Sequence, residues 1–488
     1  MLSVKRWITC ACALLVSVAQ ATAADVVVDW NNVLLDTIRA TGGPPCPISR
    51  TQALVHAAIY DAVNSIDRKH EPYLEFIPAP VGASSPAAAA AAAHRVLTTL
   101  FPARAAIYDA ALAASLADVP DGANETAGVT LGRAAADALL DERADDGTQE
   151  NPTYVIENNP GDWRPTFPDY TSTPFNPSWG YTAPWTMFDG DQYRPIGPLG
   201  IRKMSTLLQS RGYADQVNEV KSFGSRNSTV RTAEQTRIAF FWANDVNGTY
   251  KPPGHLNAIT QVVSHDRGLS MIENARLFAL TNLAMADAAV VAWDSKYDTN
   301  IDLWRPISAI RLADTDGNAR TVADPNWEPL NPFTPPFPAY VSGHATFGAV
   351  HAAVMAGYFG TDKVTFTITS EDPFYVALGG GPRTFKKFSD AGWENGISRL
   401  YLGVHFRFDA TDGNRAGTEL GKYVVRNYLR PISRADLDGN GKMTVQDLKA
   451  FTAAYAGGEV AADMDSNGVI NTLDLGRFMM FYGKGGRG

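Results

Sequence analysis

Two histidines lie in short turns that are flanked by glycine and by apolar residues. The first is His344, in the stretch FPAYVSGHATF at 337–347, and the second is His405, in SRLYLGVHFRFD at 398–409. A histidine can move a proton near neutral pH or offer a ring nitrogen as a ligand. The whole chain has 8 histidines, so two in such similar surroundings are the first candidates for a reactive site.

Cationic and hydrogen-bonding groups accompany these histidines. A third stretch, AVVAWDSKYDTNIDLWRPISAIR at 289–311, precedes them in the chain. Together the three stretches supply Lys296, Arg305, Ser342, Gly343 and Arg399. Two guanidinium groups, an ammonium group, a hydroxyl and a backbone N–H at a helix start are the groups that hold a tetrahedral oxyanion. One histidine is then left to bond the central atom and the other to move protons.

Asp409 follows His405 by four residues. On a helix that begins near Gly403, this offset lets the carboxylate accept a hydrogen bond from the imidazole and fix its tautomer. The other histidines, His56, His70, His94, His255, His265 and His351, have no such supporting groups, and no catalytic role is expected for them. His56 is expected in the core.

In this order, the three stretches resemble the type 2 phosphatidic acid phosphatase and vanadium haloperoxidase superfamily, and above all its vanadium-dependent chloroperoxidases. The resemblance implies a mainly α-helical bundle with vanadate as cofactor and with hydrogen peroxide and halide as substrates. It implies that His405 bonds vanadium and that His344 is the acid–base residue. The vanadate oxygens would be held by Lys296, Arg305, Ser342, Gly343 and Arg399.

The resemblance also implies supporting roles for residues outside the cradle. Trp293 and Phe337 match the aromatic residues that flank the halide region in the family. The stretch FFWAND at 240–245 resembles the segment whose aspartate supports the last arginine, so Asp245 is the expected partner of Arg399. The resemblance runs from about residue 30 to residue 430.

Two departures from the family pattern stand out. Lys296 and Arg305 are nine residues apart rather than seven, which indicates a two-residue insertion within YDTNIDL. If a helix bulge absorbs the insertion, both cations still converge on the oxyanion; if it does not, Lys296 misses the oxyanion. Asp298 occupies the seven-residue spacing but has the wrong charge for an oxyanion ligand. Val341 stands where proline usually precedes Ser-Gly-His, a change that concerns the loop rather than the chemistry.

Three functions are compatible with these residues. The first is a haloperoxidase, which the aromatic pair and the extended chloroperoxidase-like framework favour. The second is a phosphatase in which His405 attacks phosphorus and His344 protonates the leaving alkoxide, because phosphate and vanadate share shape and charge. The third is an inactive helical scaffold, which leaves the convergent cations and histidines unexplained.

The last sixty residues contain two loops of the calcium-binding pattern, DLDGNGKMTVQD and DMDSNGVINTLD. Each places oxygen-bearing side chains at positions 1, 3, 5 and 12 and glycine at position 6, with a backbone carbonyl expected at position 7. The expected ligands are Asp436, Asp438, Asn440, Lys442 and Asp447 in the first loop, and Asp463, Asp465, Asn467, Val469 and Asp474 in the second. The duplicated loop and helix resemble a dockerin domain, which implies Ca²⁺-dependent folding and a cohesin-type partner. The alternative is a calcium-stabilised tail without a partner.

The N-terminus has Lys5 and Arg6 before an apolar run and a small-residue site near Ala23, a pattern typical of a cleaved signal peptide. Cleavage would leave Cys46 as a lone thiol and predicts a secreted or periplasmic protein. The net charge of −9 argues against nucleic acid as a partner. No membrane span is expected beyond the signal, because later apolar runs are interrupted.

The expected domains are a signal peptide at 1–23, a catalytic domain at 24–430 and a dockerin-like domain at 431–488. Residues 150–200 lack any period and are rich in proline and aromatic residues, which predicts long surface loops. The stretch VTFTIT at 364–369 predicts a strand, and Ser85-Pro86 predicts the start of an alanine-rich helix. Helical periodicity predicts further helices at about 49–66, 104–116, 126–142, 231–244, 270–293, 342–358, 385–400 and 404–429.

Overall fold

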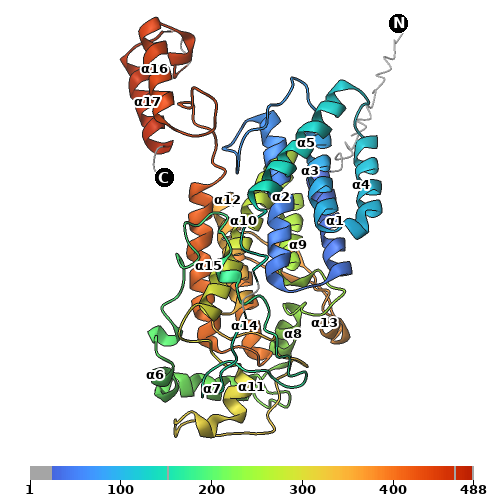
Figure 1. Ribbon diagram of the computed structural model, residues 1–488, viewed down its shortest axis with the longest axis vertical. Helices are drawn as coiled ribbons and strands as arrows, with labels where there is room; N and C mark the ends of the chain where they lie inside the picture. Colours follow the sequence, from blue (N-terminus) through green and yellow to red (C-terminus); the bar gives the residue numbers. More distant parts are fainter. Residues whose placement is uncertain (1–24, 151–152, 466–468, 486–488) are drawn as a thin grey trace, which may run out of the picture.

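The computed structural model describes residues 25–150, 153–465 and 469–485. The expected signal peptide at 1–23 lies outside the described residues. The chain forms a bundle of long helices with loops and short helices gathered at one end (Figure 1). The helices are α1 Val26–Thr41, α2 Pro45–Asp67, α3 Ser85–Leu100, α4 Ala105–Ala117, α5 Ala123–Glu142, α6 Met204–Gln209, α7 Arg211–Phe223, α8 Ala233–Phe241, α9 Lys251–Asp266, α10 Met271–Tyr297, α11 Pro306–Arg311, α12 Gly343–Phe359, α13 Pro373–Ala377, α14 Phe388–Tyr401, α15 Arg407–Asn427, α16 Val445–Gly457 and α17 Thr472–Gly485.

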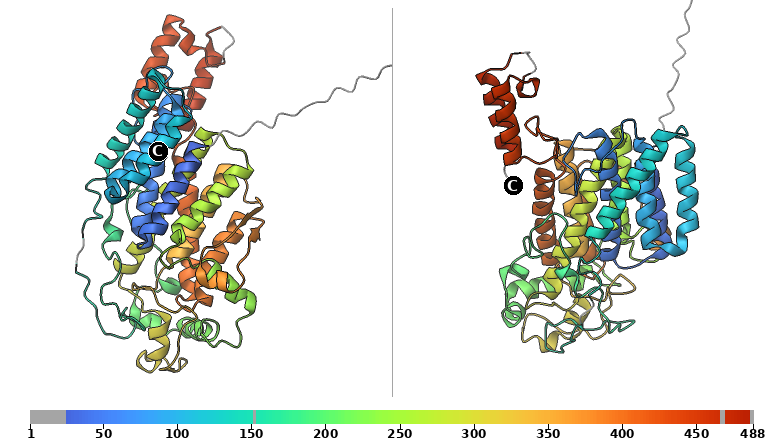
Figure 2. Two further views of the ribbon diagram at one scale, coloured as in Figure 1. Left: turned by 90° about the vertical axis from the view of Figure 1, so that its right-hand side faces the viewer. Right: turned by 45° about the horizontal axis from the view of Figure 1, so that its top comes forward.

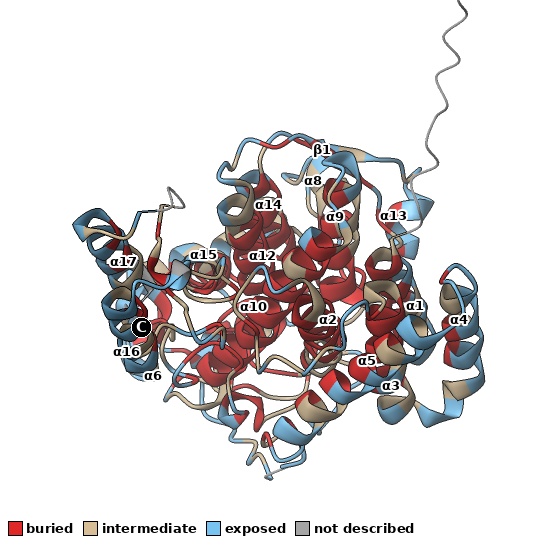
Figure 3. Cartoon of the chain, turned by 90° about the horizontal axis from the view of Figure 1, so that it is seen from above, coloured by how far each residue is buried: buried red, intermediate tan, exposed pale blue. Residues whose placement is uncertain are grey.

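Helix α10 lies at the centre of the bundle, between α2 and α12 (Figure 3). It is long and apolar enough to cross a membrane by composition, but 94% of its most apolar window is buried inside the molecule. A helix that is apolar on all sides and covered by other helices is the core helix of a large bundle. Its last turn carries Trp293 and Lys296, so the core helix leads directly to the expected site.

Helices α12 and α15 pack along most of their length. Two glycines of α15 permit the close approach, because a Cβ atom on Gly417 would lie 2.4 Å from the Thr346 carbonyl oxygen and one on Gly421 would lie 2.7 Å from that of Val350. Contacts this short exclude any side chain. The glycines therefore bring α15 against the helix whose first turn carries His344.

The strand content of the described chain is small. Strands β1 Phe366–Ile368 and β2 Arg383–Phe385 form an antiparallel pair with Phe366 opposite Phe385. The strand expected at 364–369 is present in its central residues. The described residues also form five short 3₁₀ helices: Pro102–Arg104, Trp179–Tyr181, Pro198–Gly200, Ala313–Thr315 and Val460–Ala462.

The prediction of a mainly α-helical protein is confirmed, and several boundaries differ from expectation. Ser84 rather than Ser85 caps α3, and its side chain accepts a hydrogen bond from the Ala87 N–H at 3.3 Å. Helix α8 ends at Phe241, three residues before the expected end, because the chain turns at Asn244 with φ of 46°. Helix α15 begins at Arg407 rather than near 403, so His405 precedes the helix. Helices α7 and α9 were not expected.

The region from 150 to 200 contains no α-helix in its described part, but it is not simply a surface loop. Trp163, Trp179 and Trp185 are all buried. The expectation of surface loops is therefore wrong for these residues, since aromatic side chains without any period can still be buried by long-range packing.

Residues after 430 pack separately from the main bundle. The large hydrophobic cluster ends at Leu429, and a second cluster begins at Ala435 and centres on the stacked rings of Phe451 and Phe478, 3.9 Å apart. Helices α16 and α17 stand apart from the bundle in Figure 1 and in the right-hand view of Figure 2. The domain boundary expected at 430 falls between the two clusters.

Candidate active site

The three chemically active stretches meet around one cavity of about 420 Å³. The last turn of α10, the start of α12, the end of α14 and the turn before α15 all contribute to it. The expected site residues that line it are Trp293, Phe337, Gly343, His344, Arg399 and His405, with Asp245 beside them. Tertiary packing therefore brings together residues that are more than one hundred positions apart in the sequence.

His405 is held with one ring nitrogen on Asp409 and the other on Arg305. Its Nδ1 lies 2.9 Å from the Asp409 carboxylate, and its Nε2 lies 3.0 Å from Arg305 Nη1. Because a guanidinium can only donate, Nε2 is the acceptor and Nδ1 carries the proton. Burial, together with Arg305, Lys296 and Arg399, holds the pKa of His405 well below its usual range. The ring is thus neutral, with a lone pair on Nε2.

The contact between His405 and Asp409 is the expected one, but its geometric reason is different. Asp409 is the third residue of α15, and the same carboxylate oxygen accepts the Phe406 N–H at 3.0 Å in a helix cap. The pair therefore comes from a helix start rather than from two positions on one helical face. Burial raises the pKa of Asp409 to about 7.

The two arginines carry donors that no acceptor in the described part of the chain satisfies. Arg305 donates from Nε to the Phe337 carbonyl at 2.7 Å, while its Nη2 is buried without a partner. Arg399 donates from Nη2 to Asp245 at 2.6 Å, while its Nε and Nη1 are likewise buried and unpaired. Buried N–H groups of a cation are costly to leave unpaired. Three such groups beside His405 are what an absent oxyanion would satisfy.

His344 lies in the first turn of α12, at the wall of the cavity. Its Nε2 lies 3.3 Å from the Ala243 carbonyl oxygen, which places the ring proton on Nε2 and leaves Nδ1 as the basic nitrogen. Burial and the charge of Arg399 lower the pKa of His344 to about 4, against the opposing effect of Asp245. At neutral pH the ring is therefore a base rather than a cation.

Ser342 and Gly343 start helix α12. The Ser342 hydroxyl oxygen accepts the Ala345 N–H at 3.4 Å as an N-cap, which leaves its own hydrogen to donate. Gly343 lines the cavity, and a Cβ atom there would lie 3.4 Å from the Trp293 ring. The preceding peptide bond, Tyr340–Val341, is cis at the position where the family pattern has proline.

Lys296 differs most from expectation. Its ammonium group donates to the carbonyl oxygens of Pro338, Ala339 and Val341, at 2.9 and 3.1 Å for the first two. All three N–H groups are thus engaged, and the residue does not line the cavity. Burial and the neighbouring Arg305 hold its pKa well below its usual range. In this structure Lys296 holds the loop before Ser342 rather than facing the oxyanion position.

Of the two outcomes considered for the extra residues between Lys296 and Arg305, the structure shows the second: no helix bulge forms, and Lys296 does not face the oxyanion position. Helix α10 ends at Tyr297, and residues 298–304 form a separate loop that brings Arg305 to the start of α11. Asp298 faces away from the site, toward Gly180 and Tyr181. A loop absorbs the insertion because the helix has already ended.

Residues 243–245 form a short segment that contacts both His344 and Arg399. Its Ala243 carbonyl contacts His344, and its Asp245 carboxylate pairs with Arg399. Arg399 and His344 hold the pKa of Asp245 below its usual range, against the effect of burial. The partnership of Asp245 with Arg399 is the one that the family resemblance implies. The role of Ala243 was not expected, because a backbone carbonyl leaves no signal in a sequence.

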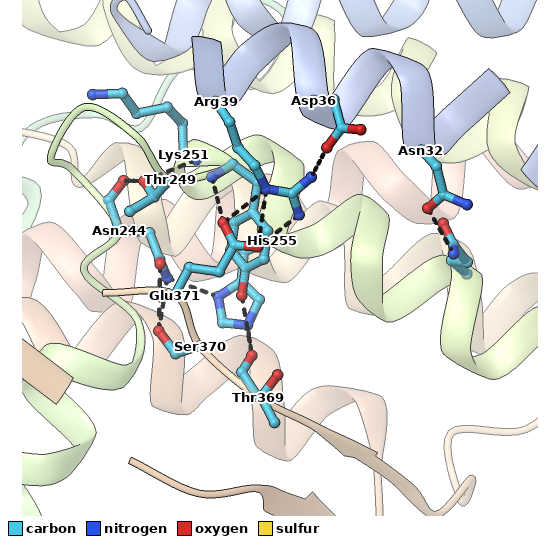
Figure 4. A network of polar contacts seen from close by, with 12 residues as sticks. Asn32, Asp36, Arg39, Asn244, Thr249, Lys251, His255, Thr369, Ser370 and Glu371 are labelled. Atoms are coloured by element: carbon cyan, nitrogen blue, oxygen red, sulfur yellow. Dashed lines mark hydrogen bonds and ion pairs between the residues drawn. The ribbon is translucent and has the colours of Figure 1, made fainter. Parts of the chain in front are cut away.

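Asn244, in the middle of this segment, is fixed by a buried network (Figure 4). Its Nδ2 donates to Ser370 Oγ at 3.1 Å and to His255 Nδ1 at 3.2 Å, and its backbone N–H donates to Asp372 at 3.1 Å. His255 in turn contacts the Thr369 carbonyl at 2.9 Å. The network ties the segment to the loop after β1.

The remaining expectations for histidines agree with their contacts. His56 is buried, stacks on Phe278 at 4.8 Å and contacts Asn31 at 3.1 Å. His351 is buried on Thr260 at 2.9 Å. None of the six other histidines lines the cavity. Cys46 is a buried free thiol, as expected.

The two C-terminal loops bring carboxylates together. Oxygen atoms of Asp436, Asp438 and Asp447 lie within 4.8 Å of one another, and those of Asp463, Asp465 and Asp474 do the same. Such triads fit a hard cation that takes oxygen ligands. Asn440 accepts the Lys442 N–H at 2.7 Å. Asn467 lies outside the described residues.

Comparison with known proteins relates this architecture to vanadium enzymes. Residues 276–434 match the family described as the VCPO second helical-bundle domain. The vanadium chloroperoxidase of Curvularia inaequalis is 28% identical over 86% of this chain and 83% of that protein. The crystal structure of a bacterial vanadium-dependent iodoperoxidase is 25% identical, with a TM-score of 0.69 over 82% of this chain and 95% of that one. A holo-type bacterial vanadium-dependent chloroperoxidase shares the fold, with 18% identity and a TM-score of 0.63 over 80% and 93% of the two chains.

The fold and these similarities define a helical-bundle protein of the vanadium haloperoxidase type. The chain is thus similar to vanadium haloperoxidases in sequence and in fold over most of its length. The resemblance inferred from its three stretches is thereby confirmed. The family match ends at residue 434, so the dockerin resemblance of the C-terminal unit stays a prediction.

Proposed function

We propose that this protein is a vanadate-dependent haloperoxidase that uses hydrogen peroxide to oxidise a halide to hypohalous acid. One observation carries the proposal: three buried guanidinium nitrogens of Arg305 and Arg399 lack acceptors in the described chain, beside a neutral histidine whose Nε2 lone pair faces the Arg305 guanidinium. An anion with several oxygens and a central atom that accepts a nitrogen ligand satisfies all of these groups at once. The relatives, a chloroperoxidase and an iodoperoxidase, support the same activity.

The residues present fit vanadate. The Arg305 and Arg399 guanidinium groups, the Ser342 hydroxyl and the Gly343 N–H would hold its oxygens, and His405 Nε2 would bond the metal. Lys296 would act on vanadate only through its charge, because its ammonium group is bonded to the carbonyl oxygens of the loop before Ser342. When bound, vanadate activates hydrogen peroxide toward a halide. The overall reaction takes up one proton and yields hypohalous acid and water.

His344 and Asp409 set the protonation of the site. His344 is neutral and has a basic Nδ1 at the cavity wall, so it can take a proton from incoming hydrogen peroxide and return it to a departing oxygen. Asp409 holds the His405 proton on Nδ1, which keeps Nε2 available as a ligand. Trp293 and Phe337, with ring centroids 5.0 Å apart, form an apolar wall beside this position where a weakly hydrated halide can lie.

Substitution of each histidine by alanine distinguishes their two proposed roles. His405→Ala should abolish vanadate binding, measured by calorimetry, together with bromination of a dye. His344→Ala should keep vanadate binding and lower turnover by about 10²–10⁴, the usual contribution of a general acid–base residue. Full activity in both variants would contradict the proposal.

A phosphatase remains the second candidate, because the arginine donors suit phosphate as well as vanadate. It predicts hydrolysis of a chromogenic phosphate ester by vanadate-free protein and inhibition of that hydrolysis by vanadate. Bromination that depends on added vanadate, without hydrolysis, decides for the haloperoxidase. Loss of both activities, with calcium-dependent stability retained, would point to the scaffold alternative.

For the C-terminal unit we propose calcium binding in both loops and docking to a cohesin-type partner. The carboxylate triads and the tandem repeat of the loop support calcium. The partner rests on the dockerin resemblance alone, and its test is binding of the full chain to a cohesin with and without calcium. The signal-peptide pattern supports a secreted or periplasmic location, which fractionation of cells that express the chain would test.

A further inference from the structure

The active-site cavity is larger than its proposed inorganic reactants require. Its volume is about 420 Å³, within the range of pockets that hold small organic ligands, roughly 300–1,000 Å³. Vanadate, hydrogen peroxide and a halide are small, and bound at the residues proposed for them they would fill only part of this volume. The rest of the cavity is large enough to bind a further small molecule.

The wall of this remaining space is aromatic and proline-rich. It is built from separate segments that carry Phe167, Phe175, Pro252, Pro336 and Phe337. Phe175 and Phe337 have ring centroids 6.4 Å apart, and the Phe175 carbonyl accepts the Trp293 indole N–H at 3.0 Å. Rings and prolines lose little conformational entropy on binding, so the wall suits a flat apolar molecule.

One ammonium group on this wall has hydrogen-bond donors that the described chain does not satisfy. Lys251, at the start of α9, is 5% exposed and lines the cavity. In the described chain its ammonium group makes one hydrogen bond, to the Asp245 carbonyl oxygen at 2.6 Å. Two of its three N–H groups therefore remain for a ligand. The backbone of Lys251 has a φ of 60°, a left-handed conformation that lysine rarely adopts. The surrounding structure must therefore impose this conformation.

Two carboxylates of the described chain also line the cavity, Asp169 and Asp245. Burial lowers the pKa of Lys251, and the charge of Asp245 opposes this effect by raising it. The Asp245 carboxylate is paired with Arg399 at 2.6 Å. Asp169 is exposed at the outer end of the cavity. A buried ammonium group with free donors beside an aromatic wall favours a ligand with a flat apolar body and one anionic oxygen group.

We propose that this cavity binds the organic acceptor of the halogenation, and that the acceptor is an electron-rich aromatic molecule whose carboxylate or similar anionic group is bound by Lys251. The inference rests on the proposed haloperoxidase function. Hypohalous acid formed near His405 then meets the acceptor before it leaves the protein. A ring carbon forms a bond to the halogen as the halogen–oxygen bond breaks, and the proton lost from that carbon joins the departing hydroxide as water.

A matched pair of acceptors tests the assignment. 4-Hydroxybenzoate and 4-hydroxybenzamide share shape and ring, but only the first carries a carboxylate. The ratio of kcat/KM for bromination of the two is measured in the vanadate-loaded full chain and in Lys251→Met, Lys251→Arg and Lys363→Met, the last an exposed lysine outside the cavity. A ratio is used because any change in the oxidation step cancels.

The wild-type ratio should exceed the ratio that free hypobromous acid gives with the same two molecules. Lys251→Met should lower it about tenfold, the effect of losing one charge-assisted contact. Lys251→Arg and Lys363→Met should retain it. Saturation-transfer NMR, without vanadate or peroxide, should show 4-hydroxybenzoate binding to the wild-type protein and weaker binding to Lys251→Met.

Failure of this inference and failure of the proposed function are distinguishable. Oxidation of iodide to triiodide needs no organic acceptor, so its presence supports the haloperoxidase whatever the ratios are. If iodide is oxidised but every variant shows the ratio of free hypobromous acid, the acceptor site is wrong. If iodide is not oxidised with vanadate and peroxide, the proposed function fails, and the acceptor assignment fails with it.

Discussion

Asn244 is the residue through which the protein positions both His344 and Arg399. It is fully buried, and its neighbours on each side provide the Ala243 carbonyl and the Asp245 carboxylate that those two residues contact. Its side-chain amide is held by Ser370 and His255. Since the backbone at Asn244 has φ of 46°, the segment depends on this side chain for its conformation.

Asn244→Gly tests this role without adding backbone strain, because glycine adopts a positive φ freely. We expect weaker vanadate binding and lower kcat, each by about tenfold, the effect of losing roughly 1.4 kcal/mol of positioning. Binding is measured by calorimetry and kcat by bromination. The control is Asn32→Ala, which removes an exposed hydrogen bond from Gln261; Asn32 is labelled in Figure 4. A variant that is less stable but keeps wild-type binding and kcat would show that Asn244 only supports the fold.

Helices α12 and α15 determine where the site residues start. His344 follows the first residue of α12, and His405 lies two residues before α15. The Ser342 N–H donates to the Asp409 carbonyl oxygen at 3.1 Å, which joins the two helix starts directly. Close packing of these helices therefore sets the relation between the proton-moving residue and the proposed metal ligand.

Gly417→Ala should disturb that relation. The new Cβ atom would lie 2.4 Å from the Thr346 carbonyl oxygen, and such overpacking costs typically about 1–3 kcal/mol of stability. We expect a lower denaturation midpoint and weaker vanadate binding. Gly476→Ala in α17, where the Cβ atom meets open space, should instead be neutral or stabilising, since alanine favours a helix. Equal effects of the two substitutions would contradict the role of close packing.

At the scale of the whole molecule, the described residues form two hydrophobic clusters with different sources of stability. The main cluster is large, whereas the second contains few buried side chains around Phe451 and Phe478. Small units of this kind need added stabilisation from metals or cross-links. The carboxylate triads lie in this unit, and Gly439 of its first loop contacts Arg68 of the main bundle at 3.5 Å.

Removal of calcium should therefore unfold only the C-terminal unit. With a chelator, calorimetry should show the main transition unchanged and the smaller one shifted to lower temperature. Asp447→Ala, which removes an oxygen donor from the first loop, should reproduce the effect even with calcium present, while bromination activity is retained. A single transition that is insensitive to calcium would refute the proposed metal sites.

Much of the site was readable from residue types and order. The three stretches contain the histidines and arginines that the structure brings together, and the pairs Arg399–Asp245 and His405–Asp409 follow from pattern and spacing. Periodicity located most of the long helices, because burial of one helix face is repeated along the chain. These features are local, or they belong to a family pattern.

Only the tertiary structure decided which polar groups remain free. Lys296 was expected to face the oxyanion, but three carbonyl groups of a loop some forty residues away take its donors. Lys251 and the aromatic residues of the aperiodic loops line the cavity, although nothing in their sequence surroundings indicates it. The sequence by itself therefore indicated the oxyanion-binding residues and most helices, but not the choice between peroxidase and phosphatase. The availability of each donor and the shape of the cavity depend on long-range packing, which leaves no period in the chain.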